Sequence, residues 1–209
     1  MDRRAAQPQY HPMFWHVLFW FSLVWLVYIY IGYPVCLWLL SLAARFRCKP
    51  DADYEPRVTV LFSARDEIAA LPNKMANLRA LNYPKEKVQI LVASDGSTDG
   101  TDRFLSAQPD VEAVLFDRSV GKNVALNHLL PRATGEVLFF TDANTFFDRS
   151  AVRETVKLFG DKRVGAVTGE LRYLHAGPDD SVSQGTGLYW WYENKIKELE
   201  SRIGSVLVG

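Results

Sequence analysis

The feature that most constrains the fold is an uncharged segment near the N-terminus. Residues 14–44 read FWHVLFWFSLVWLVYIYIGYPVCLWLLSLAA and contain no Asp, Glu, Lys or Arg. A helix that crosses a bilayer needs about 20 consecutive apolar residues, so this segment can span with length left for tilt. A secretory signal peptide is the alternative, but its apolar region covers only about 7–15 residues and ends at a small-residue cleavage site. We therefore expect an N-terminal tail, residues 1–13, followed by one transmembrane segment, residues 14–44.

Gly32 and Pro34 lie inside this segment and are expected to kink or divide its helix, which a bilayer helix tolerates. Two basic residues precede the segment and three follow it: Arg3 and Arg4, then Arg45, Arg47 and Lys49. Cytoplasmic flanks carry the excess of positive charge. The pattern thus predicts a single-pass protein of the cell membrane (plasma or inner membrane) whose C-terminal part lies in the cytoplasm, with the lipid bilayer as a partner.

The composition excludes several other classes of function. Lys and Arg number 24, equal to the 24 Asp and Glu, so no positive field favours nucleic acid as a partner. The two cysteines, Cys36 and Cys48, lie in or beside the apolar segment and indicate no disulfide framework. The four histidines have no ligand-like spacing, which excludes a Cys/His metal site.

After a polar linker, residues 45–57, strand-like and helix-like patterns alternate. Short β-branched runs predict strands at residues 58–62, 88–93, 111–116, 137–141 and 164–168. Helical spacing or polarity predicts helices at 68–81, 101–107, 124–130 and 148–159. Such alternation favours right-handed crossovers and a mostly parallel sheet flanked by helices. Residues 184–209 have helical character, and their aromatic cluster, residues 189–192, suits either a membrane interface or the core face of a helix.

Polar residues follow the predicted strands, at the edge where ligands collect in open α/β sheets. After the second strand come Ser-Asp-Gly-Ser-Thr, residues 94–98, in which Gly96 allows a sharp turn and Asp95 offers an acceptor for a base or ribose. Ser97, Thr98 or Asp99 can cap the next helix. Lys122 can reach a phosphate, and Asp142 with Asn144 can face one divalent cation. Each feature alone also suits an ordinary turn, cap or solvated side chain.

Five pieces of the chain resemble one family in content and order: SARDE (63–67), SDGSTDGT (94–101), GKNVALN (121–127), ATGEVLFFTDAN (133–144) and VGAVTG (164–169). They are similar to the donor-binding half of glycosyltransferase family 2, with the GT-A fold, over residues 58–209. The chain looks closest to membrane-anchored processive synthases of β-linked polysaccharides, such as cellulose, hyaluronan and poly-N-acetylglucosamine synthases. The resemblance implies a hexosyltransferase that moves a sugar from a nucleoside diphosphate donor, usually UDP, to a glycan or lipid-linked acceptor with inversion.

The resemblance also implies roles for individual residues. Ala64 and Glu67 would line the nucleoside pocket, Asp95 would hold the base, and Lys122 would lie near the nucleotide. A divalent cation, Mg²⁺ or Mn²⁺, would be held by Asp142 and Asn144. The full set implied for nucleotide binding is Ala64, Arg65, Glu67, Asp95, Gly96, Ser97, Lys122 and Asp142.

The sequence departs from the family pattern at three places. Ser94 replaces one of two aspartates often found there, and Asn144 offers a carbonyl where a carboxylate is usual. The acid that serves as general base in this family lies in a motif beyond Gly209, so the catalytic base is unassigned. Four glutamates are interpreted as solvated helix positions: Glu170, Glu193, Glu198 and Glu200.

These departures leave two functions open. The first is a membrane-anchored glycosyltransferase whose acceptor half is supplied by further sequence or by another chain. The second is a non-catalytic module that binds a nucleotide sugar. A dinucleotide-dependent oxidoreductase is disfavoured, because SARDE stands where a Gly-x-Gly-x-x-Gly would follow the first strand.

Overall fold

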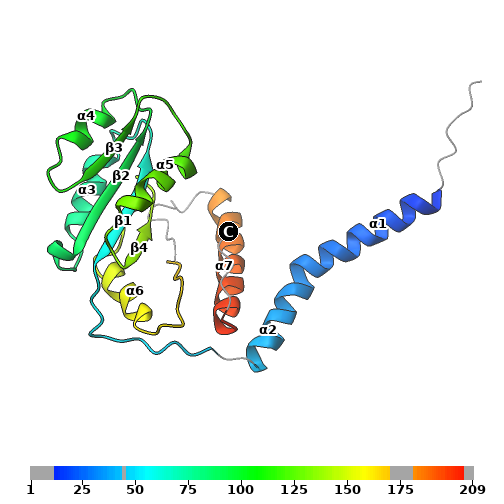
Figure 1. Cartoon of the computed structure of the whole chain (residues 1–209). Helices are drawn as coiled ribbons and strands as arrows, with labels where there is room; N and C mark the ends of the chain where they lie inside the picture. Colours follow the sequence, from blue (N-terminus) through cyan, green and yellow to red (C-terminus); the bar gives the residue numbers. More distant parts are fainter. Residues whose placement is uncertain (1–11, 44–45, 170–180, 205–209) are drawn as a thin grey trace, which may run out of the picture. The chain divides into compact units, whose positions relative to one another are not determined.

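The computed structural model describes residues 12–43, 46–169 and 181–204 (Figure 1). The chain divides into two compact units. One comprises Cys48–Val167, and the other combines Met1–Arg47 with Thr168–Gly209. The two units are described separately.

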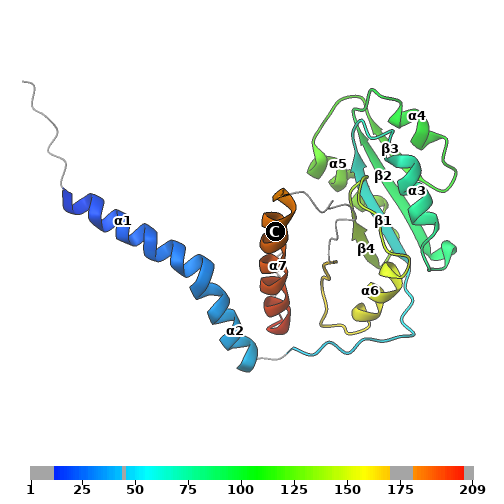
Figure 2. The same ribbon diagram turned by 180° about the vertical axis from the view of Figure 1, so that it is seen from behind.

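The Cys48–Val167 unit is a four-stranded parallel sheet with helices on both faces (Figures 1 and 2). Its strands are β1 (Val58–Ala64), β2 (Val88–Asp95), β3 (Glu112–Phe116) and β4 (Val137–Phe140), in the order β3-β2-β1-β4. Its α-helices are α3 (Leu71–Arg79), α4 (Thr101–Ser106), α5 (Lys122–Leu129) and α6 (Ala151–Phe159), and its short 3₁₀ turns are η2 (Lys85–Lys87) and η3 (Leu130–Arg132). The parallel α/β architecture predicted from the sequence is confirmed.

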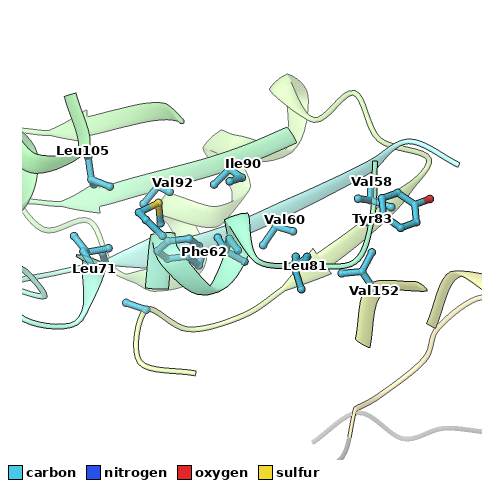
Figure 3. Packing of buried hydrophobic residues seen from close by; sticks show 14 of the residues in the cluster. Val58, Val60, Phe62, Leu71, Leu81, Tyr83, Ile90, Val92, Leu105 and Val152 are labelled. Carbon is cyan, nitrogen blue, oxygen red and sulfur yellow. The ribbon is translucent and has the colours of Figure 1, made fainter. Parts of the chain in front are cut away.

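Alternate residues of the central strands build two separate cores, because successive strand side chains point to opposite faces of a sheet. Figure 3 shows the larger core, in which Val58, Val60 and Phe62 of β1 pack with Ile90 and Val92 of β2 beneath α3, α4 and α6. On the other face, residues of β1 and β2 pack against α5 in a smaller cluster: Leu61, Leu91, Ala93, Ala125 and Leu129. Both central strands are therefore buried on two sides, as their continuous apolar sequence predicts.

The predicted fifth strand is wrong. Residues 164–169 carry no strand, and the described sheet ends at β4, which pairs with β1 alone. A run such as VGAVT becomes a strand only where a neighbour supplies its ladder of hydrogen bonds, and Gly165 in its middle weakens its strand preference.

The other unit contains the apolar segment as a divided helix. Helix α1 (Pro12–Val27) passes through a π-helical turn, η1 (Tyr28–Gly32), into α2 (Tyr33–Ala43), and Figure 1 shows the axis changing direction there. This confirms the interruption predicted at Gly32 and Pro34. Among the described residues, one helical stretch, Met13–Ala43, is long and apolar enough to cross a membrane.

Helix α7 (Ser181–Arg202) contacts α2 in the same unit. The hydroxyl of Tyr33 donates to Glu200 at 2.5 Å, and Glu200 is only 4% exposed. The prediction of a solvated side chain at Glu200 is therefore wrong, since the carboxylate has exchanged water for a phenol. Glu170 lies outside the described residues. Of the aromatic cluster, Tyr189 and Trp191 are exposed, which contradicts the core interpretation for those two rings.

Candidate functional site

The loops that follow β1, β2 and β3 contact one another at the carboxyl edge of the sheet. Arg65 donates to Ser119 Oγ at 3.1 Å, and the Thr98 N–H donates to Asp66 Oδ1 at 2.7 Å. The Glu67 N–H donates to Thr101 Oγ1 at 3.1 Å. The polar stretches that the sequence placed after three separate strands are thus joined by direct hydrogen bonds.

Asp95, the last residue of β2, is buried and lies at the centre of these loops. Its Oδ1 accepts from the Val120 N–H at 2.6 Å, and its Oδ2 accepts from Ser119 Oγ at 2.8 Å and from the Gly121 N–H at 3.1 Å. Burial raises the pKa of this carboxyl, but the three hydrogen bonds and the nearby Arg65 together lower the pKa below its ordinary value. Asp95 therefore holds the segment that leads into α5.

Four residues of these loops have positive φ, and two of them, Gly96 and Asp66, are held there by contacts with another loop. Gly96 has φ +68°, and a Cβ there would lie 2.5 Å from the Ser119 nitrogen, so the turn predicted at Gly96 is confirmed and only glycine fits it. Asp66 has φ +52° without being glycine, a conformation that its own hydrogen bonds to Thr98 help to hold. Backbone strain of this kind concentrates at binding sites.

Residues near the start of α4 tie the β2 loop to the β1 loop. The carboxylate of Asp99 accepts from the Thr101 N–H at 3.0 Å and from the Ile68 N–H at 2.9 Å. These hydrogen bonds lower the pKa of Asp99, that from Ile68 most. The N-cap residue of α4 is Gly100, without a side-chain cap, so the predicted N-cap at Ser97, Thr98 or Asp99 is wrong. Ser94 stands where an aspartate is often found in the family pattern, and its hydroxyl donates to the carboxylate of Asp102.

The loop after β4 carries the two predicted cation ligands, and both are exposed. Asp142 forms an ion pair with Lys122, the first residue of α5, although the two are 20 positions apart. Side chains of both are more than half exposed, so the pair is accessible to a ligand.

The donor set fits a hard divalent cation that also binds phosphates. Asp142 and Asn144 offer a carboxylate and a carbonyl oxygen two residues apart, and a cation such as Mg²⁺ commonly takes one or two protein oxygens with substrate phosphates and water. The described residues contain no group of three His, Cys, Asp or Glu side chains able to hold a metal by themselves.

Lys74 is a residue of this region that the sequence interpretation missed. It lies on the buried side of α3 with no exposed surface, and its ammonium donates to Thr141 Oγ1 at 3.0 Å and to the Thr145 carbonyl oxygen. Burial lowers the pKa of Lys74 to about 8, while the Asp142 carboxylate acts in the opposite direction. Lys74 lies three residues after Leu71 and four before Leu78, on the apolar face of the helix, and this spacing could have predicted that its side chain is buried.

The remaining predicted residues occupy different depths. Ala64 is buried in the larger core, whereas Arg65 is exposed and Glu67 is half-buried. Ser97 Oγ lies 2.8 Å from Ser94 Oγ and accepts from the Asp66 N–H at 3.2 Å. The roles assigned to these residues in nucleotide binding stay predictions.

Comparison with known proteins places this geometry in a wider context. The sequence model of Glycosyl transferase family 2 matches residues 59–204, which include every loop described above. A beta-monoglucosyldiacylglycerol synthase from Nostoc sp. (strain PCC 7120) is 32% identical over 118 residues, 54% of this chain and 25% of that protein. A poly-beta-1,6-N-acetyl-D-glucosamine synthase from Staphylococcus aureus is 29% identical over 130 residues, 59% of this chain and 31% of that protein.

Among solved structures, a mannosyltransferase from Pyrobaculum calidifontis in complex with GDP-Man and Mn²⁺ is 30% identical, with a TM-score of 0.67. The likeness covers 86% of this chain and 50% of that one. The matched segments thus amount to about a third or less of the two curated relatives and to half of the solved structure.

Proposed function

Because the chain belongs to glycosyl transferase family 2, we propose that it takes part in transferring a sugar from a nucleoside diphosphate donor, with UDP as the nucleotide, and with inversion at the anomeric carbon. The observation that carries this proposal is the ion pair between Lys122 and Asp142. It joins the start of α5 to the loop after β4, beside a set of linked loops at the edge where α/β sheets bind ligands. The similarity to a mannosyltransferase whose structure contains GDP-Man supports a sugar nucleotide as the donor.

In this proposal the nucleoside is bound by the loops after β1 and β2, with Ala64, Arg65, Glu67, Gly96 and Ser97 at or near it. Asp95 both holds the 119–121 segment and offers an acceptor to the base. Three of the roughly four acceptor positions of its carboxylate are already filled by the 119–121 segment, and one remains for a base N–H.

The diphosphate is bound by Lys122, and Asp142 with Asn144 would hold a cation beside the phosphates. The cation proposed here, Mg²⁺ or Mn²⁺, supplies positive charge that stabilises the departing diphosphate. With nucleotide and cation bound, the Lys122 ammonium would donate to a phosphate oxygen, and the Asp142 carboxylate would be free to ligate the cation. Lys122 therefore contributes a positive charge to both states of the site.

We further propose that residues 14–44 anchor the protein in the cell membrane with the sugar-nucleotide site in the cytoplasm, because the only candidate membrane span among the described residues lies there. An acceptor at or near the bilayer, either a glycan or a lipid-linked molecule, suits such an anchor. No residue of the chain is assigned as the general base.

The test is calorimetric titration of the full chain in detergent micelles with UDP, and in parallel with GDP, each with and without Mn²⁺. We expect Mn²⁺-assisted binding of UDP that is lost in Asp142→Ala. Asp161→Ala serves as the control, because Asp161 follows α6 and pairs with Arg163, away from the loops of the site. Binding of GDP alone would contradict the assignment of UDP, and binding of neither nucleotide by the folded chain would contradict a donor site.

A further inference from the structure

A buried positive charge lies directly beneath the proposed cation-binding loop. The ammonium of Lys74 donates to the Thr141 hydroxyl at 3.0 Å and to the Thr145 backbone carbonyl. These two residues bracket Asp142, Ala143 and Asn144, so one ammonium bonds both ends of the loop. Helix α3, which carries Lys74, also holds the chain just beyond this loop, because the Asn77 side chain forms two hydrogen bonds of 2.8 Å with the Phe147 backbone.

Aromatic rings complete the environment of this ammonium. Its Nζ lies 5.5 Å from the centroid of the Phe62 ring and 4.9 Å from that of Phe147. Cations are attracted to the faces of such rings, and the attraction strengthens when water is excluded. Lys74 therefore has two oxygen acceptors and two rings around a charge with no exposed surface.

The core alone does not require a lysine here. Burying a charge costs free energy that packing of an apolar side chain of similar length would avoid. With a pKa of about 8, the ammonium is nonetheless mostly protonated at neutral pH. The acceptors of the ammonium are both in the loop after β4, and the rings beside it are those of Phe147 in that loop and of Phe62 in β1, which points to the loop as the reason for the charge.

We infer that Lys74 is a positioning residue that fixes the 141–145 loop so that the oxygens of Asp142 and Asn144 face one cation. This inference rests on the proposed function of that loop. The restraint matters more here than in a site with two carboxylates, because Asn144 is a neutral and weaker ligand whose contribution depends on its placement. Lys122 contacts Asp142 from the α5 side, whereas Lys74 fixes the loop from the α3 side.

The test uses two variants of the full chain that act on the same contact from opposite sides. Lys74→Met keeps the length of the side chain and removes its charge. Thr141→Val keeps the shape and the lysine but removes one acceptor, together with the long hydrogen bond of 3.4 Å that the hydroxyl donates to the Asp142 carbonyl. Lys87→Met is the matched control, since Lys87 is a half-buried lysine paired with Glu55 just before β2, at the other end of the sheet.

Two quantities are measured after thermal unfolding has shown that each variant is folded. The first is amide hydrogen exchange of residues 141–147 without ligand, and the second is the Mn²⁺ concentration that half-saturates UDP binding. We expect faster exchange and an increase of about tenfold in that Mn²⁺ concentration for both loop variants, typical of losing a residue that orients a metal ligand. Lys87→Met should match the wild type in both, and Thr141→Val should have no further effect on UDP binding in an Asp142→Ala background.

The outcomes separate the two proposals. If the wild type binds UDP with Mn²⁺ while folded Thr141→Val and Lys74→Met retain its Mn²⁺ dependence and its exchange rates, the positioning role of Lys74 is overturned and the donor site stands. If the wild type shows no Mn²⁺-assisted binding of UDP, the proposed function is overturned, and the inference about Lys74 with it.

Discussion

Replacing Asp95 with Asn tests whether this buried carboxylate holds the loop before α5. Asparagine has the same shape but keeps only one of the two acceptor oxygens. If its carbonyl takes the place of Oδ2, the hydrogen bonds from Ser119 and Gly121 survive and the Val120 N–H faces an amide donor. If the side chain turns over, two hydrogen bonds are lost instead.

The smaller loss sets the expected magnitude. One hydrogen bond to a charged acceptor contributes about 1.5–3 kcal/mol, and the two surviving bonds weaken when the charge is removed. The lower cost of burying a neutral amide offsets part of this. We expect a net loss of about 2 kcal/mol in the free energy of unfolding, which for a chain of this size lowers the Tm by roughly 4–8 °C.

The assay is thermal unfolding followed by near-ultraviolet circular dichroism at pH 7. The matched control is Asp117→Asn, because Asp117 is an exposed aspartate in the loop before α5. For this control we expect the free energy of unfolding to change by no more than about 0.5 kcal/mol. Equal Tm values for Asp95→Asn and Asp117→Asn would refute the structural role of Asp95. A fall in UDP affinity without any fall in Tm would assign Asp95 to the ligand instead.

Three further predictions concern the same loops. Gly96→Ala should lower the free energy of unfolding in urea by more than about 1–2 kcal/mol, because its Cβ would meet the Ser119 backbone. In Gly100→Ala the Cβ would have no atom within 4 Å, so this control should lose only the roughly 1–2 kcal/mol that a positive φ costs a residue with a Cβ. Equal losses in the two variants would contradict the close approach of Gly96 to Ser119. Because the pKa of Asp95 is lowered by folding, the contribution of its carboxylate to stability is present above the ordinary carboxyl pKa and is lost as the pH falls through the lower pKa of the folded state. The difference in Tm between the wild type and Asp95→Asn should therefore shrink below about pH 4. A difference in Tm that stays constant with pH would refute the lowered pKa. Lys122→Met should change stability by less than about 0.5 kcal/mol, since its ion pair is exposed, yet weaken UDP binding about tenfold in calorimetry; an unchanged affinity would remove Lys122 from the site.

The sequence predicted the parts of the fold that depend on local pattern. Strands β1 and β2 are continuous apolar runs that end in polar residues, and their positions follow from that contrast. The turn at Gly96 could likewise be predicted, since a glycine among small polar residues is typical of a tight turn. The predicted strand at 164–168 failed because a strand depends on a partner that local pattern does not reveal.

Contacts between residues that are distant in the chain could not be predicted from the sequence for a similar reason. The pair of Lys122 and Asp142 depends on strand order, which places β4 beside β1 rather than beside β3. Glu200 was interpreted as solvated, after the usual rule that charged side chains face water, and Lys74 was not singled out from the sequence at all. Lys74 is buried beside Thr141 and Glu200 beside Tyr33. Both partners lie far away in the chain, so local pattern does not reveal the contacts.

The central claim is that the linked loops at the carboxyl edge of the sheet bind the nucleotide of a sugar donor. Photolabelling of the full chain with UDP that carries an azide on its uracil ring, followed by peptide mapping, tests this claim most directly. The account predicts labelling of peptides that contain residues 64–67 or 94–97, with protection by unmodified UDP. Labelling confined to other peptides, or labelling that UDP does not compete away, would contradict it.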